Sequence, residues 1–195
     1  MADQVSSTPS KTEYFEPAWV GEVIRFWFEE LTEDHWFARS DDLDAQIRKR
    51  FLTLHEQLVA DDGFGVAAPR PLLAAAIVLD QFSRNMFRGT PRAYAADAIA
   101  RRLARTAIEQ GFDAAMKKQE RLFLYLPFEH SEDREDQAMS LQLFERLGHE
   151  EWTRHAMAHK VIIDRFGRFP HRNATLNRSS TTTEIAHLRE TTGSL

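Results

Sequence analysis

The segment PLLAAAIVLDQFSRNMFRG, residues 71–89, decides the fold of this chain. From Pro71 to Leu79 it is apolar on every side, which predicts a helix that its neighbours bury completely. The same helix then turns polar, with the side chains Asp80, Gln81, Arg84, Asn85 and Arg88. A buried helix with a polar second half predicts a helical core that carries a candidate site.

Helical signals continue on both sides of this segment. Apolar residues spaced by three and four predict a helix from Pro17 to Glu30, and another begins after an N-cap at Ser40. The remaining expected helices cover residues 90–110, 112–126, 131–148 and 150–166, with a short one from about residue 181. No segment has the alternation of a strand. The sequence therefore predicts an all-α fold of seven or eight helices, stacked as antiparallel pairs in a short solenoid or a bundle.

Several of these boundaries depend on single residues. Thr90, followed by a proline, has the pattern of an N-cap and first helical position. Pro127 is expected to end the preceding helix, because it lacks an N–H and clashes with the previous turn. Ser131, with Glu132 and Asp133, is expected to cap the next helix, and Thr181 with Glu184 has the spacing of a capping box.

A chain of 195 residues has the size of one domain and buries enough surface to fold without staples. We expect residues 1–16 to form a disordered tail and residues 17–195 a single all-α domain. The absence of cysteine excludes disulfides, thiolate nucleophiles and cysteine-ligated metal centres. The N-terminus lacks the features of a secretory signal, and the longest apolar run, residues 72–79, is far shorter than the roughly 18 residues of a membrane span. These features predict a soluble, cytoplasmic protein without a membrane partner.

Charge is unevenly distributed along the chain. The net charge of −5 argues against a nucleic-acid partner. Between residues 29 and 44 seven carboxylates accompany one arginine, whereas between residues 84 and 105 six arginines accompany only Asp97. In one interpretation, acidic and basic helices pack side by side and pair their charges. In the other, the arginine-rich segments form an RNA-binding surface.

Three segments together resemble the bacterial family known as domain of unknown function 924. They are LDQFSRNMFRGTPRAYAADAIA (79–100), LYLPFEHSEDREDQ (124–137) and IIDRFGRFPHRN (162–173). The resemblance implies a tetratricopeptide-like helical fold and no particular activity. The family has a glycine near the arginine that follows HRN, whereas this chain has Asn177 before Arg178. Because asparagine tolerates left-handed backbone, we expect the turn to persist.

The polar half of the 71–89 helix is the first candidate site. Asp80, Arg84 and Arg88 are four residues apart and share one face, with Gln81 and Asn85 beside them. In one interpretation, Asp80 pairs with Arg84 and the arginines bind carbonyls near the helix end. In the other, the five side chains form a pocket rim that recognises an anion. Such a cluster needs partners from elsewhere in the chain if it is buried.

Carboxylates and histidines gather in two further places. One holds Glu129, His130, Glu132 and Asp133 at a helix junction, and the other holds His155 and His159. Two imidazoles four residues apart on a helix are able to bind one metal ion. With Glu129 or Asp80 they would complete a site for zinc or non-haem iron, although a core histidine more often makes one ordinary hydrogen bond. The sequence indicates no particular cofactor.

The turn RFGRFPHRN, residues 165–173, alternates cations with aromatic rings. Its candidate ligand-binding side chains are Arg165, Arg168, His171, Arg172 and Asn173. In a structural role, the two phenylalanines would fill the core while the arginines tie loops to helix ends. In a functional role, the cations would join Arg84 and Arg88 in holding a carboxylate or phosphate.

The most economical hypothesis gathers these clusters into one polar pocket for a small anionic ligand or a peptide terminus. If the protein is an enzyme, Glu129, His130 and His159 are its candidate catalytic acid–base groups. No glycine-rich phosphate loop, nucleophile elbow or paired-carboxylate signature defines a reaction class. The alternatives are a tetratricopeptide-like protein-interaction module without catalysis, and an RNA-binding protein.

Overall fold

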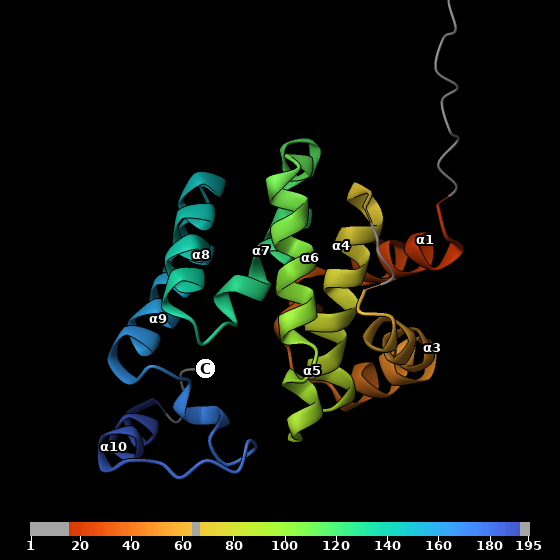
Figure 1. Cartoon of the computed structure of the whole chain (residues 1–195). Coiled ribbons are helices and arrows are strands. Elements are labelled where there is room, and N and C mark those ends of the chain that lie inside the picture. The colour runs from red at the N-terminus through yellow and green to blue at the C-terminus, as the bar shows by residue number, and fades with distance from the viewer. Residues whose placement is uncertain (1–15, 64–66, 192–195) are drawn as a thin grey trace, which may run out of the picture.

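The computed structural model describes residues 16–63 and 67–191, and in these ranges the chain forms helices and turns without a strand (Figure 1). The α-helices are α1 (Ala18–Arg25), α2 (Glu33–Phe37), α3 (Asp41–Ala60), α4 (Pro69–Ile77), α5 (Ser83–Met86), α6 (Asp97–Glu109), α7 (Lys118–Glu129), α8 (Arg134–Leu147), α9 (Glu150–Phe166) and α10 (Thr182–Thr191). The short π- and 3₁₀-helical turns are η1 (Phe26–Glu30), η2 (Val78–Phe82), η3 (Pro91–Tyr94), η4 (Phe112–Ala115) and η5 (Pro170–Arg172). The predicted all-α class is confirmed, and the tetratricopeptide-like stacking stays a prediction.

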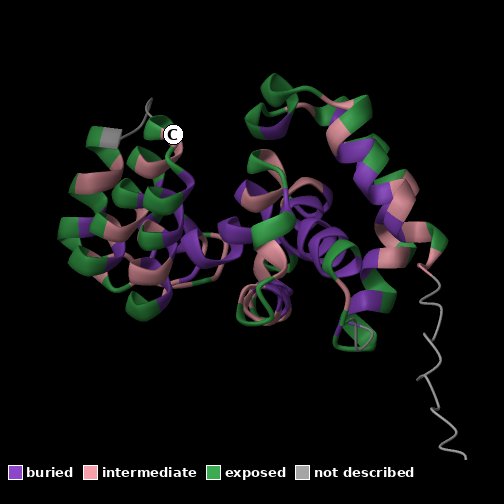
Figure 2. Ribbon diagram, turned by 90° about the horizontal axis from the view of Figure 1, so that it is seen from above, coloured by how far each residue is buried: buried purple, intermediate pink, exposed green. Residues whose placement is uncertain are grey.

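The helix at the centre of the fold runs without a break through α4, η2 and α5. Every residue from Pro71 to Leu79 is buried, as the apolar run predicted, and Asp80 and Gln81 are buried as well. This helix packs against α1, α6 and α7, while η2 contacts α3. Helices α4 and α6 are in contact, and both contain fully buried alanines, at 74–76 and at 100, 104 and 107. The buried residues follow these central helices (Figure 2). One hydrophobic core contains residues from Val20 to Ala156, which supports the single domain that we propose.

An aromatic cluster fixes the N-terminal helices to this centre. Phe82 of η2 packs against the rings of Phe26 and Phe51, with centroids 5.8 and 4.8 Å away. Trp36 lies on the short helix α2, and its Nε1–H donates to the Trp27 carbonyl oxygen over 2.9 Å. Helix α2 was not predicted, because five residues are too few to show a helical period. It nevertheless forms one wall of the cavity described below.

Several predicted helix starts differ from the structure. Thr90 and Pro91 have the predicted N-cap and first positions, but only the 3₁₀ turn η3 follows them. The Thr90 hydroxyl donates to the Phe87 carbonyl, and α6 begins at Asp97. The predicted cap segment 131–133 does precede α8, but Asp133 and not Ser131 supplies the cap. Asp133 accepts hydrogen bonds from the first-turn N–H groups of Glu135 and Asp136, while the Ser131 hydroxyl donates to the Asp136 carboxylate.

Pro127 lies inside α7 and does not end it. A 3₁₀ turn at Phe112–Ala115 precedes this helix, which starts at Lys118 and continues through the proline to Glu129. Only the hydrogen bond that the proline nitrogen cannot make is lost, because the N–H of His130 still reaches the Leu126 carbonyl. This extra turn carries Glu129 and His130 as part of a helix end and not of a loop.

The C-terminal part follows the prediction closely. Helix α9 covers Glu150–Phe166 and ends at Gly167 with a φ of 69°, the left-handed conformation that glycine adopts freely. The capping box of α10 is present, since the Glu184 N–H donates to Thr181 Oγ1 and the Thr181 N–H donates to Glu184 Oε2. Of the predicted tail, residues 1–15 lie outside the described residues. No helix in the described part is both long and apolar enough to cross a bilayer.

Asn177 has a φ of 55°, so the left-handed turn expected at this position is present. Because its side chain is exposed, a substitution there changes mainly the backbone preference. We expect Asn177→Ala to lower the free energy of unfolding by about 1 kcal/mol, since a Cβ without a polar group disfavours this conformation. Asn177→Gly should leave stability within about 0.5 kcal/mol of the wild type. Urea denaturation of both variants checks this, and equal losses would contradict it.

Candidate functional site

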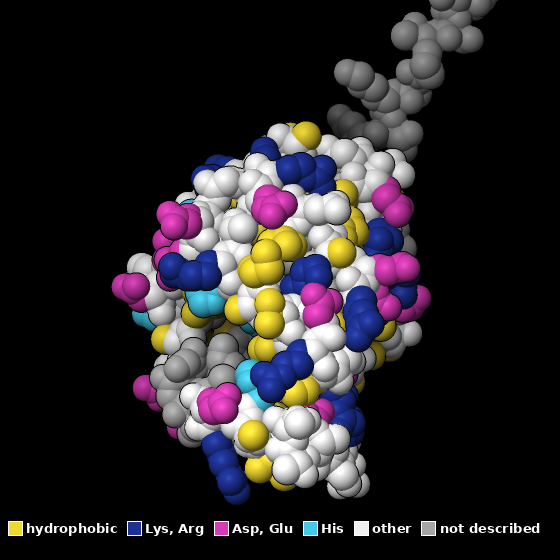
Figure 3. Space-filling view, turned by 90° about the vertical axis from the view of Figure 1, so that its left-hand side faces the viewer, with side chains coloured by type: hydrophobic (Ala, Val, Ile, Leu, Met, Phe, Trp, Pro, Cys, Tyr) yellow, Lys and Arg dark blue, Asp and Glu magenta, His cyan; other side chains and the backbone are white. Residues whose placement is uncertain are grey.

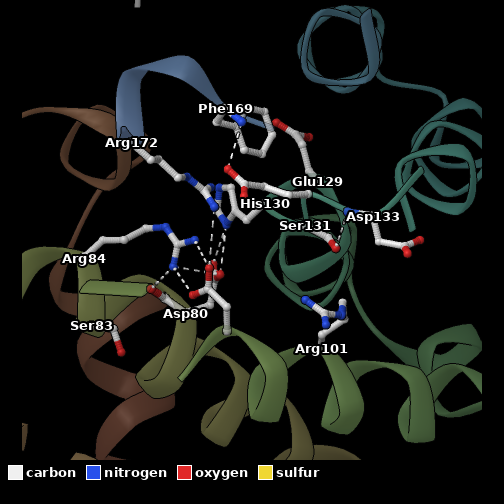
Figure 4. A network of polar contacts seen from close by, with 12 residues as sticks. Asp80, Ser83, Arg84, Arg101, Glu129, His130, Ser131, Asp133, Phe169 and Arg172 are labelled. Carbon is white, nitrogen blue, oxygen red and sulfur yellow. Dashed lines mark hydrogen bonds and ion pairs between the residues drawn. The ribbon is translucent and has the colours of Figure 1, made fainter. Parts of the chain in front are cut away.

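Side chains from three separate segments meet at the polar end of the central helix (Figure 4). Asp80 and Arg84 lie on this helix, in η2 and α5, while His130 follows α7 directly and Arg172 lies on η5. Their side chains point toward one another between the helices. The structure therefore brings together part of three clusters that the sequence analysis had treated separately.

Asp80 is the centre of this network, and its side chain is completely buried. Both of its carboxylate oxygens lie 2.9 Å from Nδ1 of His130, and Oδ1 lies 3.0 Å from Nη1 of Arg84. The side-chain amide of Gln81 donates a hydrogen bond to the Asp80 carboxylate. Burial by itself would raise the pKa of Asp80, but the charge of Arg84 and the hydrogen bonds from His130 and Gln81 hold this pKa below its usual range. Asp80 is thus a buried carboxylate anion.

His130 is neutral and has one defined tautomer. Burial and the nearby charge of Arg84 lower the pKa of His130 to about 4, against the opposing effect of Asp80. Because an ionised carboxylate only accepts hydrogen bonds, the proton of the neutral imidazole lies on Nδ1. The lone pair is then on Nε2, which is the arrangement of a base held in place by a carboxylate.

Asp97 belongs to the same network, although the sequence analysis did not select it. It accepts two hydrogen bonds from Arg84, at 3.0 and 3.1 Å. Burial and the negative charge of Asp80 raise the pKa of Asp97, and Arg84 opposes them. The one sequence signal for Asp97 was its position as the single acid among six arginines between residues 84 and 105.

The buried Glu129 and the partly buried His159 form a second pair. Glu129 Oε1 lies 3.1 Å from Nδ1 of His159, a distance that would suit an ion pair. However, His159 Nδ1 also lies 3.0 Å from the carbonyl oxygen of His155. Because a carbonyl oxygen only accepts, the hydrogen on Nδ1 has a second acceptor besides Glu129. Burial and the charge of Asp80 raise the pKa of Glu129 to about 8, and burial lowers the pKa of His159 to about 4. We therefore describe both groups as neutral at pH 7.

A cavity of about 420 Å³ lies over this second pair. Its lining residues are Glu33, Asp34, Trp36, Phe37, Leu122, Leu126, Glu129, His130, Phe144, Glu151, Trp152, His155 and His159. We call it the aromatic cavity, because α2 and α9 contribute two tryptophans and a phenylalanine to its wall. Glu129, His130 and His159 are the titratable groups of its buried part, since their side chains are 5, 15 and 21% exposed.

A smaller cavity of about 290 Å³ shares His130 with the first. Its lining residues are Pro91, Tyr94, Ala95, Asp97, Arg101, His130, Ser131, Glu132, Arg172 and Leu176. We call it the arginine cavity. The three predicted catalytic residues line the aromatic cavity, whereas Arg172 is the one predicted ligand-binding residue among the residues that line the arginine cavity. His130 is common to both cavities.

Several predicted site residues lie elsewhere. Asn85 and Arg88 both bind the carboxylate of Asp44, and Arg168 binds Glu184 and the Ser179 carbonyl. These contacts join neighbouring elements, which is the structural role that the sequence analysis had weighed against ligand binding. Arg165 is exposed and lies over the ring of Phe166.

Further contacts hold the remaining predicted residues of the 165–173 turn and of the helix junction at 129–133. Asn173 is buried and accepts from Arg178 Nε, while Glu132 pairs with Arg178 at 2.6 Å. His171 is exposed beside the ring of Phe169, and Asp133 caps α8. The role of each residue in ligand binding stays a prediction, but only part of the turn reaches the two cavities.

The metal hypothesis gains no support from the geometry. His155 is 57% exposed, and its nearest carboxylate is Glu151 at 4.0 Å. His159 instead uses Nδ1 toward the His155 carbonyl and Glu129. Within residues 16–63 and 67–191, no three histidine or carboxylate side chains are grouped closely enough to hold a metal ion.

The arginine-rich segment is paired with acids along its whole length. Arg84, Arg88 and Arg92 contact Asp97, Asp44 and Glu56, and Arg101, Arg102 and Arg105 contact Asp136, Asp62 and Asp136, respectively. On the side of the molecule formed by α8, α9 and α10, acidic and basic side chains are also interspersed (Figure 3). These contacts agree with the charge-pairing interpretation of the sequence.

Comparison with known proteins identifies the family of the chain. The model of a family described as bacterial protein of unknown function (DUF924) matches residues 23–192. A solved structure of a protein of unknown function from Agrobacterium tumefaciens is 38% identical, covers 88% of this chain and 97% of its own, and superposes with a TM-score of 0.83. No curated protein shows significant similarity. The chain belongs to the DUF924 family.

Proposed function

We propose that this protein is an enzyme that binds a small organic molecule in the aromatic cavity and transfers protons on it, with His130 as base and Glu129 as acid. One observation carries the proposal: the buried carboxylate of Asp80 holds the Nδ1–H of a neutral His130, next to a glutamic acid that burial keeps protonated. Two adjacent titratable groups with pKa values displaced in opposite directions are a mark of acid–base sites.

The two groups are prepared for opposite steps at neutral pH. His130, with a pKa of about 4, has a free lone pair on Nε2, and Asp80 would stabilise the imidazolium once the ring has accepted a proton. Glu129, with a pKa of about 8, still carries its proton and is able to donate it. Asp80 acts only through His130 and is therefore a positioning residue.

The lining of the aromatic cavity favours a neutral or cationic ligand. Glu33, Asp34 and Glu151 line it, and the described residues contribute no lysine or arginine to its wall. Aromatic faces attract cations and stack on planar apolar groups. We therefore do not assign the anionic ligand expected from the sequence to this cavity. Of the cations expected to hold that ligand, Arg172 lines the arginine cavity.

A tetratricopeptide-like interaction module would recognise its partner along a concave helical face. Such a surface does not require buried titratable groups in a cavity. The burial of Glu129, His130 and Asp80 costs stability, which a binding surface has no reason to retain. This favours the enzyme over the interaction module.

Incubation of the purified protein with a bacterial metabolite extract, followed by mass spectrometry, tests the proposal. We expect the wild type to consume at least one metabolite. Glu129→Gln and His130→Asn should each slow this turnover by about 10²- to 10⁴-fold, the usual contribution of a general acid or base. Native mass spectrometry should show that the same metabolite still binds to both variants.

Two further variants serve as controls. Phe37 lines the cavity but is 61% exposed, so Phe37→Ala should weaken binding without unfolding the protein. Glu56→Gln removes an exposed carboxylate that pairs with Arg92 and should leave turnover unchanged. Turnover at the wild-type rate in Glu129→Gln and His130→Asn would overturn the proposal, as would a wild type that consumes nothing.

A further inference from the structure

The arginine cavity contains a cation whose charge is poorly satisfied. The Arg172 side chain is only 7% exposed, and its one carboxylate contact is to Asp97, at 3.8 Å. No hydrogen-bond acceptor in the described part of the chain reaches its Nε atom. Burying a guanidinium group is costly unless hydrogen bonds and an opposite charge compensate it. Arg172 therefore lacks the partners that its burial requires.

The other charged groups around this cavity have closer partners. Asp97 receives two hydrogen bonds from Arg84, at 3.0 and 3.1 Å, and Glu132 binds Arg178 at 2.6 Å. Arg101 lies 2.9 Å from Asp136. Asp97 and Glu132 each have a nearer arginine than Arg172, so neither contacts the Arg172 guanidinium closely. Arg84 is shared between Asp80 and Asp97, whereas Arg101 and Arg105 share the single carboxylate of Asp136. The excess positive charge of this network therefore lies on the Arg101 side of the cavity.

Aromatic rings fix the position of this charge. The Arg172 guanidinium lies over Tyr94, 4.7 Å from the ring centroid, and over Phe169, 4.4 Å from its centroid. The Phe169 N–H in turn donates to Glu132 Oε1 over 2.8 Å, which anchors the turn before Arg172. Such contacts restrain the plane of the guanidinium, so its edge is pre-organised to donate hydrogen bonds. A merely structural arginine would use those donors on carbonyls or carboxylates.

We infer that the arginine cavity is a binding site for an oxyanion, a carboxylate or phosphate group, with Arg172 as its principal ligand. Burial and the repulsion of Arg84 also lower the pKa of Arg172, and an anion would relieve both effects. Arg101 lines the same cavity and adds a second cation. The site does not depend on the proton transfer proposed for the aromatic cavity, although an anionic group bound here would lie against His130, which both cavities share.

Titration with inorganic phosphate and with acetate tests this site, with sodium chloride at the same ionic strength as the reference. We expect at least one of the two anions to raise the Tm of the wild type in a saturable way and to bind one site by calorimetry. A phosphate response indicates a phosphate-bearing ligand, and an acetate response a carboxylate. An effect no larger than that of chloride with both anions would overturn the inference.

Variants at residue 172 locate the binding. Arg172→Met removes the charge and should weaken the anion affinity by at least about tenfold. Arg172→Lys keeps the positive charge but loses the planar guanidinium group, so it should also weaken the anion affinity. This variant provides the test if Arg172→Met does not fold. Arg165→Met, at an exposed arginine outside the cavity, is the matched control and should bind as the wild type does. Wild-type affinity in Arg172→Lys and Arg172→Met would overturn the assignment.

Discussion

Replacing Asp80 with asparagine is expected to lower the free energy of unfolding by about 3–5 kcal/mol, because it removes one of the two carboxylates that compensate the largely buried charge of Arg84. Because asparagine has nearly the same shape as aspartate, the loss of stability would come from the missing charge and not from a cavity. Arg84, whose side chain is 20% exposed, would retain only Asp97 as a carboxylate partner, and His130 would donate to an uncharged acceptor. Denaturation in guanidinium chloride at pH 7 measures this difference.

The matched control is Asp62→Asn, which makes the same chemical change in an exposed ion pair. Asp62 lies 2.6 Å from Arg102, but its side chain is 69% exposed. Its φ of 50° also suits asparagine. An exposed pair contributes about 0–1 kcal/mol, so this variant should remain close to the wild type. If Asp80→Asn were no more destabilised than Asp62→Asn, Asp97 alone would suffice to compensate Arg84.

Replacing Glu129 with glutamine is expected to change how stability depends on pH. The pKa of Glu129 is raised from 4.5 to about 8 in the folded protein, so the folded state holds the proton more tightly than the unfolded chain. Its favourable contribution is complete below pH 4.5 and is lost as the pH rises through 8. The wild type should therefore lose stability relative to Glu129→Gln over this range, by an amount on the order of 5 kcal/mol at most.

Comparison of the two proteins at pH 6 and pH 9 measures the part of this effect that arises between pH 6 and 8, which is about 3 kcal/mol. The buried His130 and His159 act in the opposite direction, since their pKa values of about 4 remove stability as the pH falls below 6.5. Both histidines are present in the wild type and in the variant, so their contribution largely cancels in the difference. Glu184→Gln is a control, because hydrogen bonds from Arg168 and Thr181 lower the pKa of Glu184 to about 2. Its stability difference from the wild type should be the same at both pH values, whereas a constant difference for Glu129→Gln would show that Glu129 is ionised when folded.

Much of the candidate site could be predicted because its residues follow strong local signals. The change from apolar to polar within residues 71–89 selected Asp80, Gln81 and Arg84, and all three lie at the polar centre. The same rule also selected Asn85 and Arg88, which bind Asp44 instead. Spacing of four residues defines a helix face, but it does not say which neighbouring helix covers that face.

Other residues of the site have no comparable signal. Asp97 was one acid in a basic segment, and Trp36 and Phe37 lie on a helix too short to show a period. The division into two cavities was also unpredictable, because His130 lines both through contacts with segments far from it in sequence.

The sequence by itself determined the all-α fold, the buried central helix, the limits of α9 and the left-handed turn at Asn177. These features depend on residues that are close in sequence, through hydrophobic periodicity, helix caps and backbone preferences. Only the tertiary structure decided which acid each arginine binds, that Glu129 stays protonated and that Arg172 lacks a close partner. Charge and protonation depend on burial and on distances of a few ångströms between separate segments, and these exist only once the helices have packed.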